Sequence, residues 1–174
     1  HRGEQYGFVA ADGQIKGYNL DDYNIDNINS GKLLFSLYAR STDTKERDRY
    51  TKAMFLLRSQ MKTHPRTSEG GFWHKKIYPN QMWLDGLYMA SPFLAQFGGT
   101  FNEPGLYDEV AKQLLIMEKH ARDAKTGLLY HGWDESKQQR WANQQTGLSP
   151  EFWGRAMGWY AMALVDVLDY LPEK

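Results

Sequence analysis

The chain has 174 residues, no cysteine, and equal numbers of basic and acidic side chains, 21 of each. Balanced charge provides no long-range attraction to phosphate backbones or anionic lipids, so we expect neither a nucleic acid nor a membrane as partner. The lack of cysteine excludes disulfides, thiolate nucleophiles and cysteine-ligated metals, and no apolar run approaches the roughly 18 residues of a membrane span. These features fit a soluble protein of the cytoplasm or of the periplasm alike.

Apolar spacing predicts a helical chain with five helices. In chain order we expect them over residues 25–38, 44–62, 79–97, 104–121 and 149–171. The last begins with Ser149, Pro150 and Glu151, which combine an N-cap hydroxyl, a proline suited to the first turn and an acid that complements the helix dipole. The alternation that is typical of half-buried strands is largely absent.

The connections between these helices alternate in length. Two are short, whereas residues 63–78 and 122–148 form long loops that are rich in glycine, histidine, tryptophan and tyrosine. Short connections favour antiparallel neighbours, so both long loops are expected at the same end of the helices. Their aromatic content favours ordered binding loops over disordered segments.

Two aspartates stand out as candidate site residues. Asp85 lies in an otherwise almost wholly apolar helical segment, where burial of an unpaired carboxylate costs several kcal/mol. It is either a general acid with a perturbed pKa or a structural carboxylate that caps a turn or pairs with an arginine. Asp26 begins the first helix, at the loop end, and is either a second site carboxylate that approaches Asp85 or ordinary helix N-terminal charge. Two adjacent carboxylates resist joint ionisation, which raises the pKa of one of them.

Arginine, tryptophan and histidine side chains extend this candidate site. Arg155 and Trp159 are four residues apart on the fifth helix and share a face, which suits a ligand with a carboxylate. Pairing of Arg155 with Glu151 or stacking on Trp159 is the structural alternative. His74 and His131, one in each long loop, are either ligand donors or local hydrogen bonders. Aromatic planes beside polar groups fit a sugar, although the six tryptophans also fit a core.

Several common catalytic patterns are missing from the sequence. It contains no G-x-S-x-G, H-E-x-x-H, G-x-x-x-x-G-K-[ST], G-x-G-x-x-G or EF-hand loop, and its five histidines lack metal-ligand spacing. We therefore expect no metal and no cofactor.

Four segments of the chain resemble glycoside hydrolase family 105, the unsaturated rhamnogalacturonyl hydrolases. They cover residues 66–75, 78–89, 123–135 and 149–160. The resemblance, which spans roughly residues 20–172, implies an all-α fold, the (α/α)6 barrel, of which this chain supplies roughly half. Residues 1–174 would then be part of a single catalytic domain.

The resemblance also implies a reaction on an unsaturated oligosaccharide. Members of the family release the unsaturated uronic acid from the end of rhamnogalacturonan fragments. A carboxylic acid protonates C4 of the C4=C5 double bond, water adds at C5, and the resulting hemiketal rearranges to free the sugar. This differs from the usual attack of glycosidases at the anomeric carbon.

The same resemblance assigns roles to individual residues. Asp85 matches the general acid/base, and Asp26 matches the second active-site aspartate. A guanidinium suits the uronate carboxylate and an indole suits stacking. The positions that match substrate contacts are His74, His131, Arg155 and Trp159.

Two other functions remain open at this point. A related unsaturated glucuronyl hydrolase would apply the same chemistry to glycosaminoglycan fragments, with a different neighbouring sugar. A helical carbohydrate-binding protein would keep the aromatic loops without catalysis.

Overall fold

The computed structural model describes residues 8–172 and is mostly helical, as predicted. A short 3-10 helix, η1 (Leu20–Asp22), precedes the α-helices, and two three-residue strands, β1 (Gln81–Trp83) and β2 (Gly132–Asp134), form an antiparallel pair. The α-helices are α2 (Asp26–Asn29), α3 (Lys32–Arg40), α4 (Thr44–Thr63), α5 (Leu84–Phe101), α6 (Gly105–Ala121) and α7 (Gly154–Leu168).

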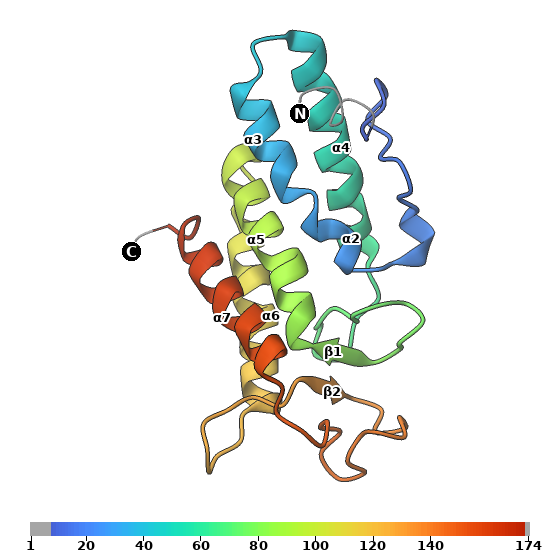
Figure 1. Ribbon diagram of the computed structural model, residues 1–174, viewed down its shortest axis with the longest axis vertical. Coiled ribbons are helices and arrows are strands. Elements are labelled where there is room, and N and C mark those ends of the chain that lie inside the picture. Colours follow the sequence, from blue (N-terminus) through green and yellow to red (C-terminus); the bar gives the residue numbers. More distant parts are fainter. Residues whose placement is uncertain (1–7, 173–174) are drawn as a thin grey trace.

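Helix α5 is the centre of the structure. It packs against α2, α6 and α7, while α3 packs against α4. The long helices follow the long axis of the molecule, and the two strands with both long loops lie at one end (Figure 1). The alternation of connection lengths therefore predicted the position of the loops correctly. Among the described residues, no helix combines the length and the apolar character of a membrane-spanning segment.

Two groups of buried side chains hold the helices together. The first joins α3, α4 and the second half of α5 through residues such as Leu57, Phe93 and Phe97. The second joins the first half of α5 to α6 and α7 through residues such as Leu84 and Met117. Because α5 contributes to both groups, it is buried on nearly all sides, as its sequence predicted.

Two predicted helix starts are wrong, and the strand pair and its flanking segment explain both. The third helix begins at Leu84 rather than at residue 79, because Gln81–Trp83 pairs with β2. The fifth begins at Gly154 rather than at residue 149. Ser149 does not act as its N-cap, since its N–H donates to the carbonyl of Gly132 at 2.9 Å and its hydroxyl accepts from the Gly132 N–H at 3.3 Å.

The first predicted helix is divided in two between α2 and α3. Gly31 lies at the break, and a Cβ atom there would be 2.4 Å from Leu57 Cδ1 and 2.9 Å from Phe93. Close approach of the chain to α4 and α5 therefore requires glycine at this position.

Candidate functional site

The strand pair brings the two long loops together around the first turn of α5. Gln81 lies opposite Asp134 in the pair, and the N–H of Leu84 donates to the carbonyl of His131 at 3.0 Å. At the far side of the loops, the backbone N–H of Ser68 donates to the carboxylate of Glu135 at 3.0 Å. The N-terminal end of α5 is thus enclosed by segments that are distant in sequence.

Asp85 occupies this enclosed first turn. The residue is 9% exposed, and its Oδ1 lies 3.4 Å from Nη2 of Arg155 in the first turn of α7. Within residues 8–172 this long contact is the one hydrogen bond of the Asp85 side chain. The guanidinium of Arg155 also stacks 3.8 Å from the ring of Trp153, and its side chain is 58% exposed. Asp85 is therefore a largely buried carboxyl group with only one long hydrogen bond from the described residues to stabilise it.

Asp26 lies in a different electrostatic environment, between two basic groups. Its Oδ1 accepts from Nε2 of His74 at 3.3 Å, and its Oδ2 pairs with Nζ of Lys75 at 2.8 Å. Partial burial acts to raise the pKa of Asp26, but the hydrogen bonds from His74 and Lys75 outweigh it and lower the pKa to about 2. Asp26 is therefore an anion at neutral pH.

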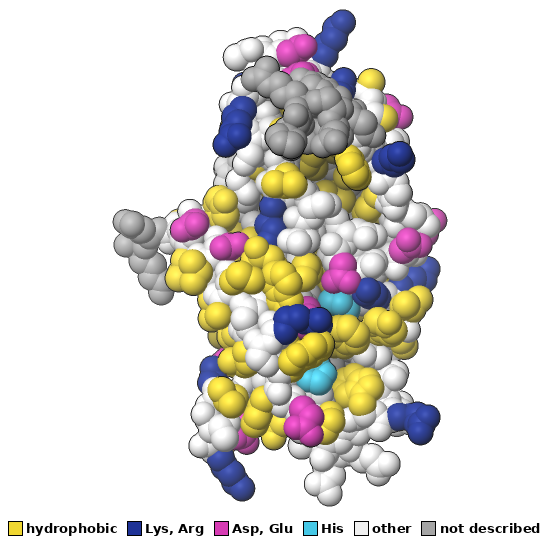
Figure 2. Space-filling view, in the orientation of Figure 1, with side chains coloured by type: hydrophobic (Ala, Val, Ile, Leu, Met, Phe, Trp, Pro, Cys, Tyr) yellow, Lys and Arg dark blue, Asp and Glu magenta, His cyan; other side chains and the backbone are white. Residues whose placement is uncertain are grey.

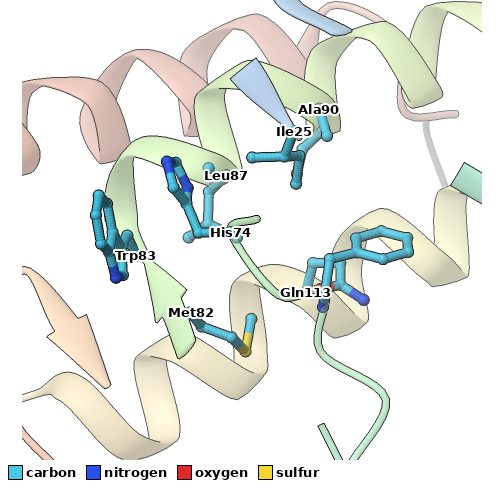
Figure 3. A pocket seen from close by; sticks show the side chains of 10 residues that line it. Ile25, His74, Met82, Trp83, Leu87, Ala90 and Gln113 are labelled. Atoms are coloured by element: carbon cyan, nitrogen blue, oxygen red, sulfur yellow. The ribbon is translucent and has the colours of Figure 1, made fainter. Parts of the chain in front are cut away.

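His74 connects the environment of Asp26 to helix α5. It is 3% exposed and stacks on Trp83 at 4.3 Å, and Tyr78 stacks on Trp83 at 5.2 Å. Its Nδ1 is buried without a hydrogen-bond partner in the described part of the chain and faces Gly86, where a Cβ atom would be only 2.9 Å away. Figure 3 shows the rings of His74 and Trp83 side by side next to α5. Gly86 therefore lets the histidine lie against the helix.

The structure places the predicted site residues in the two long loops and in the first two turns of α2, α5 and α7, but in separate contacts. In the described residues no hydrogen bond joins Asp26 to Asp85. His74 lies near both, because its Nε2 contacts Asp26 and its Nδ1 faces Gly86, the residue after Asp85. Arg155 and Trp159 contact different partners, since Trp159 packs against Tyr88 at 4.8 Å.

His131 completes the loop side of the site. Its Nδ1 donates to the carbonyl of Glu151 at 3.2 Å, and its ring meets Trp153 edge-on at 5.7 Å. On the face of the molecule over α3, α5 and α7, basic, acidic and histidine side chains lie among hydrophobic ones (Figure 2). Such a mixture offers both stacking surfaces and hydrogen-bonding groups to a ligand.

Several contacts around the predicted residues were not anticipated from the sequence. Lys75 pairs with Asp26, Trp153 supports the guanidinium of Arg155, and Lys32 lies over the ring of Tyr88. Lys75 and Trp153 stand within two residues of predicted site residues, so neighbourhood in the motif was an available signal. Within the described residues, no three histidine or acidic side chains gather in a way that could hold a metal ion.

Comparison with known proteins gives consistent matches. The model of Glycosyl Hydrolase Family 88 matches residues 5–174. A solved glycoside hydrolase from family 105 of C. acetobutylicum ATCC 824 is 52% identical, with a TM-score of 0.90 over 95% of this chain and 45% of its own. Protein Atu3128 of Agrobacterium fabrum is 46% identical over 85 residues, which are 49% of this chain and 36% of that protein.

A third relative carries a more specific name. The unsaturated rhamnogalacturonyl hydrolase YesR of Bacillus subtilis is 31% identical over 109 residues, 60% of this chain and 30% of its own length. The chain spans less than half the length of each of these three relatives. The predicted fold, an (α/α)6 barrel of which this chain supplies part, is confirmed by the structural matches.

Proposed function

The chain belongs to glycosyl hydrolase family 88, and on that basis we propose that its site removes an unsaturated uronic acid from the end of an oligosaccharide. The resemblance to glycoside hydrolase family 105 is confirmed by the clostridial structure at 52% identity. The name of the Bacillus relative supports rhamnogalacturonan fragments as the substrate. We also propose that residues 1–174 are part of one catalytic domain.

The observation that carries this proposal is the largely buried carboxyl group of Asp85, which has one long hydrogen bond in the described residues. In the proposed reaction its carboxylic acid donates a proton to C4 of the C4=C5 double bond, and water then adds at C5. The one long contact with Arg155, at 3.4 Å, leaves most of the hydrogen-bonding capacity of the Asp85 carboxyl group available for this step.

Asp26 is suited to the complementary role. The pKa near 2 keeps it ionised, so it accepts hydrogen bonds from a sugar hydroxyl or from the attacking water rather than donating a proton. His74 is buried behind it, and we assign this histidine to the support of Asp26. In this proposal the two aspartates divide the work, with Asp85 as the acid and Asp26 as the anion.

The remaining predicted residues lie on α7 and in the long loop that precedes it. We assign His131 and Arg155 to polar contacts with the substrate, because both lie beside the exposed ring of Trp153. Trp159 offers an aromatic surface one helical turn beyond Arg155. A sugar ring between these groups would meet stacking surfaces and hydrogen-bond donors together.

The test is consumption of the unsaturated bond by the intact protein. An unsaturated rhamnogalacturonan disaccharide should lose its ultraviolet absorbance, because hydration removes the conjugated C4=C5 bond. Faster turnover of an unsaturated glycosaminoglycan disaccharide would instead assign the enzyme to that substrate. Binding of both disaccharides with no loss of absorbance would contradict the proposed reaction and favour a carbohydrate-binding protein.

A further inference from the structure

The long connection between α6 and α7 borders a cavity of about 480 Å³ that the proposed reaction does not use. One wall consists of residues 122–124 and Tyr130, and the other consists of residues 141–150. The volume lies within the roughly 300 to 1,000 Å³ that is usual for small-molecule sites. None of the predicted site residues lines this cavity, so it is a place of its own within the loops.

Hydrogen bonds fix the shape of the second wall. The N–H of Asn143 donates to the carbonyl of Leu148 at 2.9 Å, and the N–H of Gly147 donates back to the carbonyl of Asn143 at 2.7 Å. The side-chain Oδ1 of Asn143 accepts from the backbone N–H groups two and three residues later, at 2.8 and 3.0 Å. This turn therefore keeps its form without a ligand.

Trp141 connects the cavity to the strand pair. A Cβ atom on Gly132 in β2 would be 3.5 Å from the Trp141 ring and 3.5 Å from the Trp83 ring. The two indoles thus lie against the same small residue, one lining the cavity and one directly before α5. Trp141 is partly exposed, so its ring offers an apolar surface to a ligand.

Three neutral groups of the lining have no hydrogen-bond partner among the residues that the structure describes. They are the hydroxyl of Tyr130, the indole N–H of Trp141 and the Nδ2 of Asn143. The Tyr130 ring is held by stacking on Phe152 at 4.4 Å. All three groups can donate a hydrogen bond, and the hydroxyl groups of a sugar can accept one.

The two charged side chains of the lining are opposite in sign and already paired. The Nη2 of Arg122 donates to Glu118 at 2.8 Å, and Asp123 accepts from the hydroxyl and the N–H of Thr126 at 2.7 and 2.9 Å. A charged ligand would therefore lose water in this cavity without gaining a free counterion. The lining favours a neutral ligand.

We propose that this cavity binds a neutral sugar residue, as a second carbohydrate site in the loop that also carries His131. The sugar would place an apolar C–H face on Trp141 and its hydroxyl groups towards the three unpaired donors. The class of ligand rests on the proposed function, in which the protein meets oligosaccharides that contain rhamnose. The methyl group of rhamnose suits the apolar part of the lining, Leu148 and Pro150.

The experiment follows the indole N–H signal of Trp141 by nuclear magnetic resonance during titration of the intact protein. Absence of the signal in Trp141→Phe assigns it. The neutral probe is methyl rhamnoside, and the anionic probe is methyl galacturonoside. Tyr130→Phe removes the hydroxyl and keeps the stacking on Phe152. Tyr38→Phe on α3 is the matched control, because its hydroxyl also has no partner among the described residues and it does not line the cavity.

We expect methyl rhamnoside to shift the Trp141 signal in a saturable way. Tyr130→Phe should weaken its binding by about twofold to tenfold, the usual effect of losing one neutral hydrogen bond, and Tyr38→Phe should not change it. Asn143→Asp, which keeps Oδ1 for the turn and loses the amide donor, should weaken binding to a similar extent. Methyl galacturonoside should bind at least about fivefold more weakly.

Three results would overturn the inference. They are a Trp141 signal that does not move with methyl rhamnoside, equal affinities for the two probes, and an unchanged affinity in Tyr130→Phe. The last of these combined with lost binding in Arg155→Gln would place the sugar at the candidate active site instead.

Failure of the proposed function has a separate signature. The ultraviolet absorbance of the unsaturated disaccharide would then stay intact, whereas the Trp141 signal still reports on the cavity, because the residues assigned to the reaction do not line it.

Discussion

Two buried carboxylates at the same end of the molecule differ in how their charge is satisfied. Asp134 in β2 is fully buried, and its two oxygens accept four hydrogen bonds of 2.7 to 2.9 Å, from the backbone and hydroxyl of Ser136 and the N–H groups of Gln138 and Gln139. Asp85 in α5 has one contact, at 3.4 Å, with Arg155.

We interpret this difference as the one between a structural carboxylate, Asp134, and the proposed general acid, Asp85. The donors around Asp134 fix the turn after β2, and a charge satisfied in this way has little capacity for a ligand. The one donor beside Asp85, Arg155, leaves most of the capacity of its oxygens available for a substrate. Burial alone therefore does not single out the proposed acid, because Asp134, with four hydrogen bonds, is the more deeply buried of the two aspartates.

The largest expected effect is on catalysis, from Asp85→Asn. Loss of a general acid should lower kcat by about 10²- to 10⁴-fold, while the melting temperature stays the same or rises because a poorly compensated buried charge is removed. Steady-state rates on the unsaturated disaccharide and thermal unfolding measure the two effects. Wild-type kcat in this variant would remove Asp85 from its proposed role.

Asp134→Ala should have the opposite profile, with its main effect on stability. Four donors would lose their acceptor, so we expect the free energy of unfolding to fall by at least about 3 kcal/mol. Chemical denaturation measures this loss, with Asp48→Asn on the exposed face of α4 as the control. A loss below about 1 kcal/mol would contradict the structural assignment of Asp134.

A smaller effect is expected when the space around His74 is filled. In Gly86→Ala the new methyl group would meet Nδ1 of His74 and displace the ring that supports Asp26, so kcat/KM should fall by about tenfold. Gly158→Ala on α7 is the matched control, because no atom lies within 4 Å of the added methyl. Equal activity of the two variants would show that the position of His74 does not affect the reaction.

The smallest effect concerns the charge of Asp26. Its folded-state pKa of about 2 lies below the ordinary 3.8, so its ionised form adds stability that is fully present above about pH 4 and is lost as the pH falls through 2. Because the side chain is 38% exposed, solvent screening keeps this contribution below about 1 kcal/mol. Denaturation of the unchanged protein and of Asp26→Asn should differ at pH 7 and converge near pH 2. A constant difference would contradict the ion pairs.

The sequence predicted the helices and the arrangement of the loops, but not the pairing of segments that are distant in the chain. The helices, the common end of both long loops and the unusual position of Asp85 followed from apolar periodicity and connection lengths. The helix starts at Leu84 and Gly154 did not, because they depend on the pairing of β1 with a strand about fifty residues away. Strands of three residues are too short for an alternation pattern to be visible.

The electrostatic surroundings of the site were equally hidden in the sequence. Asp134 was part of a motif with no sign of its burial, since its partners lie in the turn that it organises. The contact of Lys32 with Tyr88 depends on how α3 meets α5, which the sequence does not show. Pairs such as Asp26 with Lys75 required the three-dimensional arrangement.

The central claim, that Asp85 delivers a proton to C4 of the substrate, is tested most directly by the product formed in heavy water. Proton nuclear magnetic resonance of the uronic acid released in the first turnovers should show one deuterium at C4, added to a single face of the former double bond, and Asp85→Asn should abolish this incorporation. Release of the sugar with the C4=C5 double bond still present and no deuterium at C4 would contradict it.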